Sequence, residues 1–315
     1  MLITATAGKI DAAIGRFEGP IMAYMEKENG NYAANSLKKE LYNVKTSKHY
    51  SESVAGLTGI GDFVAGDGAV PYDDFQEGYT KTFTHTVFQK GIEIKRELID
   101  DSRIIDMENQ AGTITDSANR TMEKFVHAPF VYAKNTSYTL ASKDFTTTGA
   151  DTLALASAAH TSKTGKGANQ SNIVSGALSV DTLKTAEEAM IGFKTDIGEI
   201  GNFVPDTLFV PYALKDTAYE INYSLGKLNT ANNNANPYQG KYKIIVSSWL
   251  DNMGCTADAF LLDSAYMKKC LYWIDRVPLE IESRKEFNTG SWQIKGYMRY
   301  SIGFVDWRWC VLIDG

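Results

Sequence analysis

The chain has 315 residues, of which 43% are hydrophobic and 22% are charged, a balance typical of a folded protein with a sizeable core. Its formal net charge is −6, and no run of Lys and Arg supplies the basic face through which proteins bind the phosphates of nucleic acids. No stretch reaches the roughly 20 apolar residues that span a bilayer, and the first 20 residues lack the basic and apolar regions of a secretory signal.

Residues 1–50 predict two short helices on a partly extended arm. Apolar residues fall at helical spacing up to Phe17, and again at Leu37 and Leu41. Pro20 and the glycines around it interrupt the first of these patterns, so we expect the arm to break there.

From Ser51 to Asp74, five glycines scattered among apolar residues predict an extended, turn-rich loop. Gly59 and Gly61 begin a dinucleotide-binding pattern, but Val64 stands where its third glycine belongs. The nucleotide-loop interpretation is therefore set aside.

The segment Tyr79–Phe88 predicts a strand, because four threonines alternate with larger side chains. Tyr79, Phe83 and Val87 share the other face with Lys81 and His85. Neither face is apolar enough for an ordinary core strand. We expect the strand to be covered by another surface, such as a neighbouring subunit. Gly91 breaks the strand, and Ile92 resumes the alternation.

A long amphipathic helix is predicted to begin at Glu97 and to end before Pro129. Its apolar residues recur every three or four positions, and they are Ile104, Met107, Ala111, Ile114, Ala118, Met122 and Phe125. A helix of roughly 30 residues is long for a compact domain.

The rest of the chain predicts a mixed α+β fold. Residues 136–178 are rich in small polar residues and indicate loops and short strands, after which Ser179 caps a helix that reaches Phe193. Short buried strands are expected at Thr207–Val210, Lys243–Val246 and Ala259–Leu262, and Pro211 can open a further helix.

The last 40 residues alternate as strands, first from Val277 to Ile281 and then from Trp292 to Phe304. After Phe304 the apolar residues change to the other phase, from Val305 to Ile313. We interpret this change as a bulge or as a strand that is covered on both faces.

Four phrases, in this order and with these gaps, resemble the major head proteins of tailed bacteriophages with the Hong Kong 97-type fold, particularly the Mu-like head-subunit branch. They are GIGDFVAGDGAVPYDDFQEGYTKTFTHTVFQKGIEIKRELIDD from Gly59; ALASAAHTSKTGKGANQSN from Ala154; LSVDTLKTAEEAM through PDTLFVPYALKDTAYEI, which ends at Ile221; and LNTANNNANPYQGKYKIIVSSWL followed by AFLLD. The resemblance covers roughly residues 45–315.

The resemblance implies a division of the chain into five segments. They are an N-terminal arm (1–50), an extended β-hairpin loop (51–96), the spine helix of a peripheral domain (97–135), a mainly axial domain of mixed α/β structure (136–265), and C-terminal strands that complete both sheets (266–315). Contacts between subunits are expected in the extended loop and the strand after it, at Tyr72, Tyr79, Phe83, His85, Val87, Phe88 and Ile92.

The function that the resemblance implies is self-assembly into an icosahedral head shell that encloses double-stranded DNA without sequence-specific binding. The implied partners are copies of the chain in hexamers and pentamers, together with scaffolding, portal and decoration proteins, and no membrane. The implied location is the virion, after synthesis in the host cytoplasm. The chain departs from the Hong Kong 97 type in lacking a long N-terminal scaffolding segment, and nothing identifies a Lys–Asn pair for self-crosslinking.

No catalytic, cofactor or metal site is predicted. His160 lies near Asp151, Ser157 and Ser162, but no G-x-S-x-G elbow surrounds either serine, so a polar loop is favoured. No histidine has a partner at metal-ligand spacing. The cysteines are odd in number and widely spaced, which indicates buried thiols in a reducing compartment; they are Cys255, Cys270 and Cys310.

Two alternatives stay open at this point. An encapsulin-type nanocompartment shell protein shares the fold class and also assembles, but it encloses cargo enzymes. A soluble α/β enzyme would instead remain a monomer or a small oligomer and would show a concave polar site.

Overall fold

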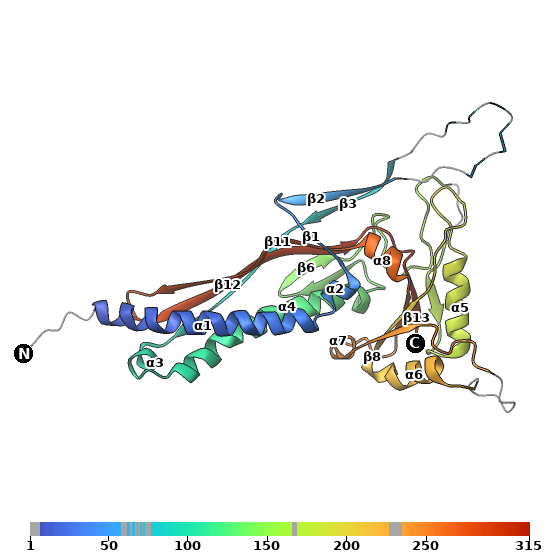
Figure 1. The fold of residues 1–315 in the computed structure, drawn as a ribbon. Helices are drawn as coiled ribbons and strands as arrows, with labels where there is room; N and C mark the ends of the chain where they lie inside the picture. The colour runs from blue at the N-terminus through green and yellow to red at the C-terminus, as the bar shows by residue number, and fades with distance from the viewer. Residues whose placement is uncertain are drawn as a thin grey trace, which may run out of the picture.

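A long limb joins a more compact block in the computed structural model of the chain (Figure 1), and a hairpin rises above both. The structure describes residues 7–57, 62, 63, 65, 66, 68, 70, 72, 77–165, 169–226 and 235–315. The arrangement belongs to the α+β class.

The limb is a four-stranded sheet covered on one face by two long helices. The strand order is β1-β11-β12-β4, with β1 parallel to β11 and the other pairs antiparallel. Its strands are β1 (Asn43–Thr46), β4 (Thr86–Ile94), β11 (Leu271–Lys285) and β12 (Trp292–Phe304). The helices are α1 (Ala7–Asn35) and α4 (Ile104–Val131), with the short α2 (Lys38–Leu41) and α3 (Arg96–Asp100) at their ends.

Helix α1 corrects the prediction of a short first helix that breaks at Pro20, whereas the second short helix, predicted around Leu37 and Leu41, is present as α2. It runs unbroken from Ala7 to Asn35 with Pro20 inside it. Ile14, Phe17 and Ile21 are buried against the limb, at a spacing that continues across Pro20. Pro20 itself is exposed, so the burial of the opposite face outweighs the local preference for a break.

Helix α4 confirms the predicted amphipathic pattern from Met107 onward, but Ile104 is 40% exposed and the predicted start at Glu97 is wrong. Met107, Ala111, Ile114 and Phe125 are all buried. The chain leaves the helical conformation between α3 and α4, where Ser102 has a φ of 51°. The helix also continues through Pro129, because the residues around it are buried in the block.

The block contains a five-stranded sheet of order β7-β13-β10-β8-β9. Its strands are β7 (Ile173–Ser175), β8 (Thr207–Pro211), β9 (Lys243–Ser247), β10 (Ala259–Leu262) and β13 (Cys310–Asp314). Its helices are α5 (Val180–Ile191), α6 (Lys215–Tyr223), α7 (Ser248–Asn252) and α8 (Ser264–Cys270), with a 3-10 turn η1 (Tyr212–Leu214) after Pro211. The Ser179 hydroxyl accepts a hydrogen bond from the Thr182 backbone N–H, which confirms the predicted helix cap.

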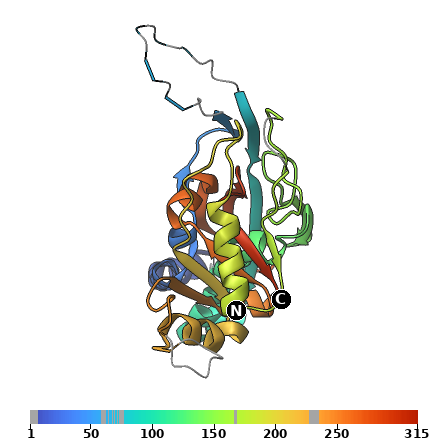
Figure 2. The ribbon, with the colours of Figure 1, turned by 90° about the vertical axis from the view of Figure 1, so that its right-hand side faces the viewer.

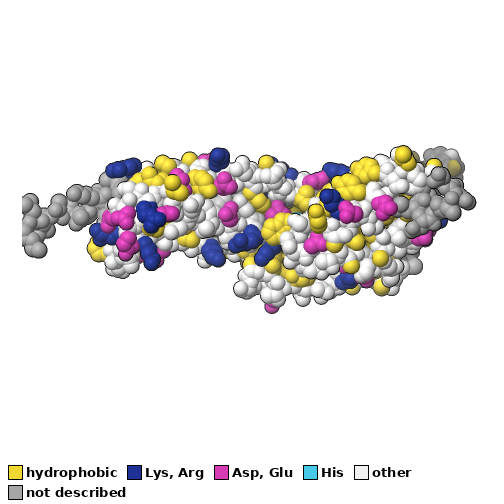
Figure 3. Space-filling view, turned by 90° about the horizontal axis from the view of Figure 1, so that it is seen from below, with side chains coloured by type: hydrophobic (Ala, Val, Ile, Leu, Met, Phe, Trp, Pro, Cys, Tyr) yellow, Lys and Arg dark blue, Asp and Glu magenta, His cyan; other side chains and the backbone are white. Residues whose placement is uncertain are grey.

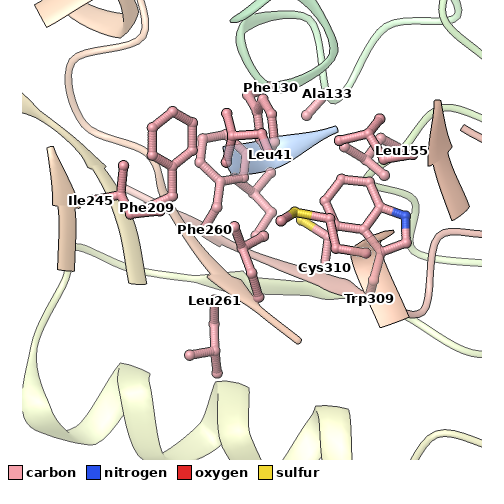
Figure 4. Close-up of a cluster of buried hydrophobic side chains, with 14 of the residues drawn as sticks. Leu41, Phe130, Ala133, Leu155, Phe209, Ile245, Phe260, Leu261, Trp309 and Cys310 are labelled. Carbon is pink, nitrogen blue, oxygen red and sulfur yellow. The ribbon is translucent and has the colours of Figure 1, made fainter. Parts of the chain in front are cut away.

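The core of the block also receives the end of the limb helix (Figure 4). Phe130 of α4 lies with its ring 4.9 Å from Phe209, 5.3 Å from Phe260 and 5.9 Å from Trp309, edge to face in each case. Leu261 points the opposite way, toward α5. One continuous buried cluster therefore joins the limb to the block.

The phase change after Phe304 is a passage between sheets, which corrects its interpretation as a bulge. Strand β12 ends at Phe304 in the limb, the chain turns through 305–309, and β13 begins in the other sheet. Residues 310–313 are buried on both faces, as the second interpretation expected.

Two small hairpins complete the fold. They are β2 (Ser51–Leu57) with β3 (Glu77–Thr84), and β5 (Ser137–Leu140) with β6 (Lys143–Thr146). The single strand predicted at 79–88 is divided at His85, because β3 pairs with β2 whereas β4 pairs with β12. Among the described residues, no helix is both long enough and apolar enough to cross a membrane.

Truncating Ile21 to alanine tests the docking of α1 on the limb. We expect the free energy of unfolding of the unassembled subunit to fall by about 2–5 kcal/mol, because a buried aliphatic side chain leaves a cavity. Urea unfolding followed by circular dichroism measures it. The matched control is Lys27→Ala at an exposed site on the same helix, where a change within about 0.5 kcal/mol is expected. Equal effects of both substitutions would contradict the docking.

Candidate assembly surface

The β2–β3 hairpin stands apart from the rest of the molecule. It forms a two-stranded sheet of its own, and Figure 2 shows β3 rising beyond the top of the block. Thr80, Thr82 and Thr84 face solvent. Phe83, on the other face, is 2% exposed and packs against Tyr272 and Ile274 of β11. An isolated two-stranded sheet is marginally stable in water, so this one depends on the surfaces that it contacts.

The predicted contact residues fall into an exposed group and a covered group. Tyr72 is 91% exposed, Val87 is 45% exposed and Tyr79 is half-buried. These three side chains retain surface that a second subunit can cover.

The covered group is already packed inside the subunit. Phe83 and His85 are buried, and His85 Nδ1 lies 3.0 Å from the Ser301 hydroxyl. Phe88 is half-buried, with its ring stacked 4.6 Å from that of Tyr300, and Ile92 is half-buried against the limb core. Because Phe83 and His85 have almost no free surface, we leave them out of the proposed contact set.

Other exposed apolar side chains were not singled out in the sequence. Phe63 is fully exposed beyond the hairpin, and Phe287 is 93% exposed at the tip of the β11–β12 hairpin. Figure 3 shows hydrophobic side chains between charged ones of both signs along one face, from the limb to the block. In the sequence, the available signal for Phe63 and Phe287 was a single aromatic residue in a predicted loop.

The face of the limb sheet that no helix covers is polar, and an ion pair and a hydrogen bond join side chains of its neighbouring strands. Lys295 Nζ lies 2.7 Å from the Glu282 carboxylate, and Arg284 Nε donates to Gln293 Oε1 at 3.1 Å. Each pair joins β11 to β12 across directly opposed positions. These two pairs are satisfied within the subunit, whereas Val87, opposite Arg299 on the same face, keeps exposed surface.

The structure brings His160 and Asp151 together, but the hydroxyls of Ser157 and Ser162 make hydrogen bonds with backbone groups. His160 Nδ1 lies 2.7 Å from Asp151 Oδ2, and Nε2 lies 3.2 Å from Asn172 Oδ1. The ring is 1% exposed and stacks on Trp307 with 4.0 Å between centroids. The Ser162 hydroxyl instead donates to a backbone carbonyl at 2.6 Å. Both ring nitrogens are occupied, so this group braces a loop and activates no serine.

A second buried histidine connects the helices of the limb to the block. The Ser247 hydroxyl donates to His127 Nε2 at 2.8 Å, and His127 Nδ1 donates to the Glu123 carbonyl at 2.8 Å. Tyr32 of α1 donates to Glu123 Oε1 at 2.9 Å. Because His127 and Ser247 are 120 residues apart, no local pattern in the sequence could have predicted the pair.

Reactive groups in the described part of the chain are held in unreactive states. Burial raises the pKa of the Cys255 thiol to about 12, and it also raises the pKa values of Cys270 and Cys310, so all three stay protonated at neutral pH. Within the described ranges, no group of three or more His, Cys, Asp or Glu side chains could hold a metal ion.

Comparison with known proteins gives one family and one fold. A family model described as phage capsid protein matches residues 78–313. No curated protein matches the sequence. Among solved structures, the capsid of an empty GTA particle is 13% identical, with 88% of each chain covered and a TM-score of 0.53. The capsid of cyanophage P-SCSP1u is 12% identical over 87% of this chain and 86% of that chain, with a TM-score of 0.53. The mature capsid of bacteriophage PhiM1 is 11% identical over 87% and 84%, with a TM-score of 0.52.

Acid should destabilise the subunit through His127. Burial lowers the pKa of His127 below its ordinary value of 6.5, although Glu123 lies 3.5 Å from Nδ1 and acts in the opposite direction. The unfolded chain therefore binds the proton more readily, and the stability from neutral His127 is lost as the pH falls below 6.5 toward the lowered value.

The measurement is urea unfolding at a series of pH values from 7 down to 5. His127→Gln should flatten the pH dependence relative to the parent chain, whereas His49→Gln, at an exposed site, should leave it unchanged. An identical slope in the parent chain and the His127 variant would show that His127 does not carry the effect.

Proposed function

The chain belongs to the family of phage capsid proteins, and from this premise we propose that it builds the icosahedral head shell of a tailed phage around double-stranded DNA. It is a shell-forming major capsid protein with the Hong Kong 97-type fold, and its place is the virion. Hexamers and pentamers, the scaffolding, portal and decoration partners, and synthesis in the host cytoplasm belong to the proposal. Membership of the Mu-like branch stays a prediction.

One observation supports this function best: the hairpin projects from the body and carries exposed aromatic side chains that its own core does not use. Tyr72 and Phe63 are almost fully exposed, at a cost that burial against a second copy would remove. Interfaces of about 1,600 Å² are standard between proteins, and many such contacts in a closed shell add through multivalency. We propose Tyr72, Tyr79 and Val87 as contact residues, with part of Phe88 and Ile92 at the margin.

The role of each of the five segments of the chain is part of the same proposal. The arm (1–50), the extended loop (51–96) and the spine segment (97–135) would form the contacts around each subunit. Residues 136–265 would form the mainly axial part, and 266–315 would complete both sheets. We assign the chain no catalytic role, since its buried histidines have structural partners.

The proposed contact surface is tested by Tyr72→Ser, with Tyr72→Phe as the matched control. Loss of the ring should shift the concentration for half assembly upward by about tenfold, which corresponds to about 1.4 kcal/mol, while Phe keeps most of the buried area. Sedimentation velocity and negative-stain electron microscopy of the purified chain measure it. The free energy of unfolding of the subunit should stay within about 0.5 kcal/mol. A parent chain that remains a monomer at every concentration would overturn the proposed function.

The net negative charge of the chain supports the proposed enclosure of DNA and provides a second test of it. With a net charge of −6, the chain as a whole offers little attraction to phosphates, which suits a container along whose wall packaged DNA slides. Purified shells mixed with linear double-stranded DNA in low salt should retain none on a density gradient. DNA that stays with the shells until salt is added would contradict this part of the proposal.

A further inference from the structure

The β2–β3 hairpin is joined to strand β4 of the limb at His85. Strand β3 ends at Thr84 and β4 begins at Thr86, and the two belong to different sheets. Phe83 is the apolar anchor at this point. A Cβ atom on Gly303 would lie 2.9 Å from its ring, so the ring sits directly on the backbone of β12. Val54 of β2 packs against the same cluster as Phe83. These two side chains fix where the hairpin leaves the body, and the contacts beyond them include two lysine hydrogen bonds with the block.

A rigid surface of the block lies beside the base of the hairpin. Residues 147–165 carry the His160–Asp151 pair, which stacks on Trp307. The Ser162 hydroxyl donates to the Asp196 carbonyl at 2.6 Å. These buried contacts fix the residues on either side of Lys163 and give the hairpin a firm support.

Two lysines connect the hairpin to this support, one that belongs to the support and one that belongs to the hairpin. Lys163 from the support donates to the Gly78 carbonyl at 2.5 Å, and its ammonium lies 5.6 Å from the centre of the Tyr79 ring. Lys81 from β3 donates to the Thr148 hydroxyl of the support at 3.1 Å.

The local geometry explains why Gly78 is available as an acceptor. The β2–β3 ladder shifts its register between Ala55 and Leu57, which places Gly78 at the irregularity. A bulge leaves backbone groups outside the ladder, and Lys163 binds one of them.

We propose that Lys163 and Lys81 form a latch that sets the angle of the hairpin against the block. Lys163 is exposed and Lys81 is half-buried, so water can replace both bonds without opening a core. The latch can therefore release while Phe83 stays seated, and the hairpin then samples more than one angle. Its consequence for assembly rests on the proposed function, because the angle decides where the exposed aromatic side chains meet a second copy.

The latch is tested first in the unassembled subunit, by the distance between two spin labels. Ser53→Cys on the hairpin and Glu188→Cys on α5 are both at exposed sites. The native cysteines are buried with raised pKa values, so they do not compete for the label. The double variant Lys163→Met, Lys81→Met should broaden the distance distribution about twofold. Lys27→Met, on the exposed side of α1, should leave it unchanged. An unchanged width in the double variant would overturn the latch.

Assembly provides the second measurement and separates the two proposals. In negative-stain images, the double variant should give a broader range of shell diameters, or tubes, whereas the parent chain and Lys27→Met give one main size. If the parent chain forms no shells, the proposed function fails while the label distances still decide on the latch. If the parent chain forms shells and the label distances do not broaden, the latch alone fails.

Discussion

The insertion of the α4 end into the core of the block is the contact on which the rest of the structure depends. Phe130 lies among Phe209, Phe260 and Trp309, so the helix that supports the limb sheet also fills the core under the other sheet. Interiors packed in this way resist small displacements. The limb and the block therefore share one core. The hairpin contacts that body through Phe83 and Val54 and through the two lysine hydrogen bonds at its base.

A paired interior and a hairpin held partly by solvent-accessible lysines are the two features from which the proposed latch follows. The polar groups inside the body are paired across elements: His127 joins α4 to β9, and Tyr32 joins α1 to α4. Buried networks of this kind specify one arrangement, because each broken bond leaves an unpaired group in a low-dielectric interior. The lysines at the hairpin base are solvated when their bonds break, so the cost of rearrangement there is small.

Much of the body was predictable from sequence, because its signals are local. The spacing of Met107, Ala111 and Ile114 predicted the buried face of α4, and Ser179 predicted the start of α5. The errors come from contacts with distant residues. Pro20 indicated a break, yet burial of Ile21 against β4 and β12 holds α1 together. Likewise His85 divides a well-patterned strand, because β2 and β12 each pair with only one side of it.

The candidate surface was less predictable, and the reason is physical. The alternating side-chain pattern of the strand predicts that Phe83 and Tyr79 lie on the same face. Whether that face packs against the same chain or against another subunit depends on residues about 190 positions away, such as Tyr272. The structure places Phe83 inside and leaves Tyr72 outside, although both are aromatic residues near the same hairpin. What distinguishes them is their distance from His85. Phe83, next to His85, attaches the hairpin to the body, whereas Tyr72 lies beyond the last ladder pair at Glu77 and is exposed. The exposed end of the hairpin is therefore the surface that the proposed contact with a second copy would cover.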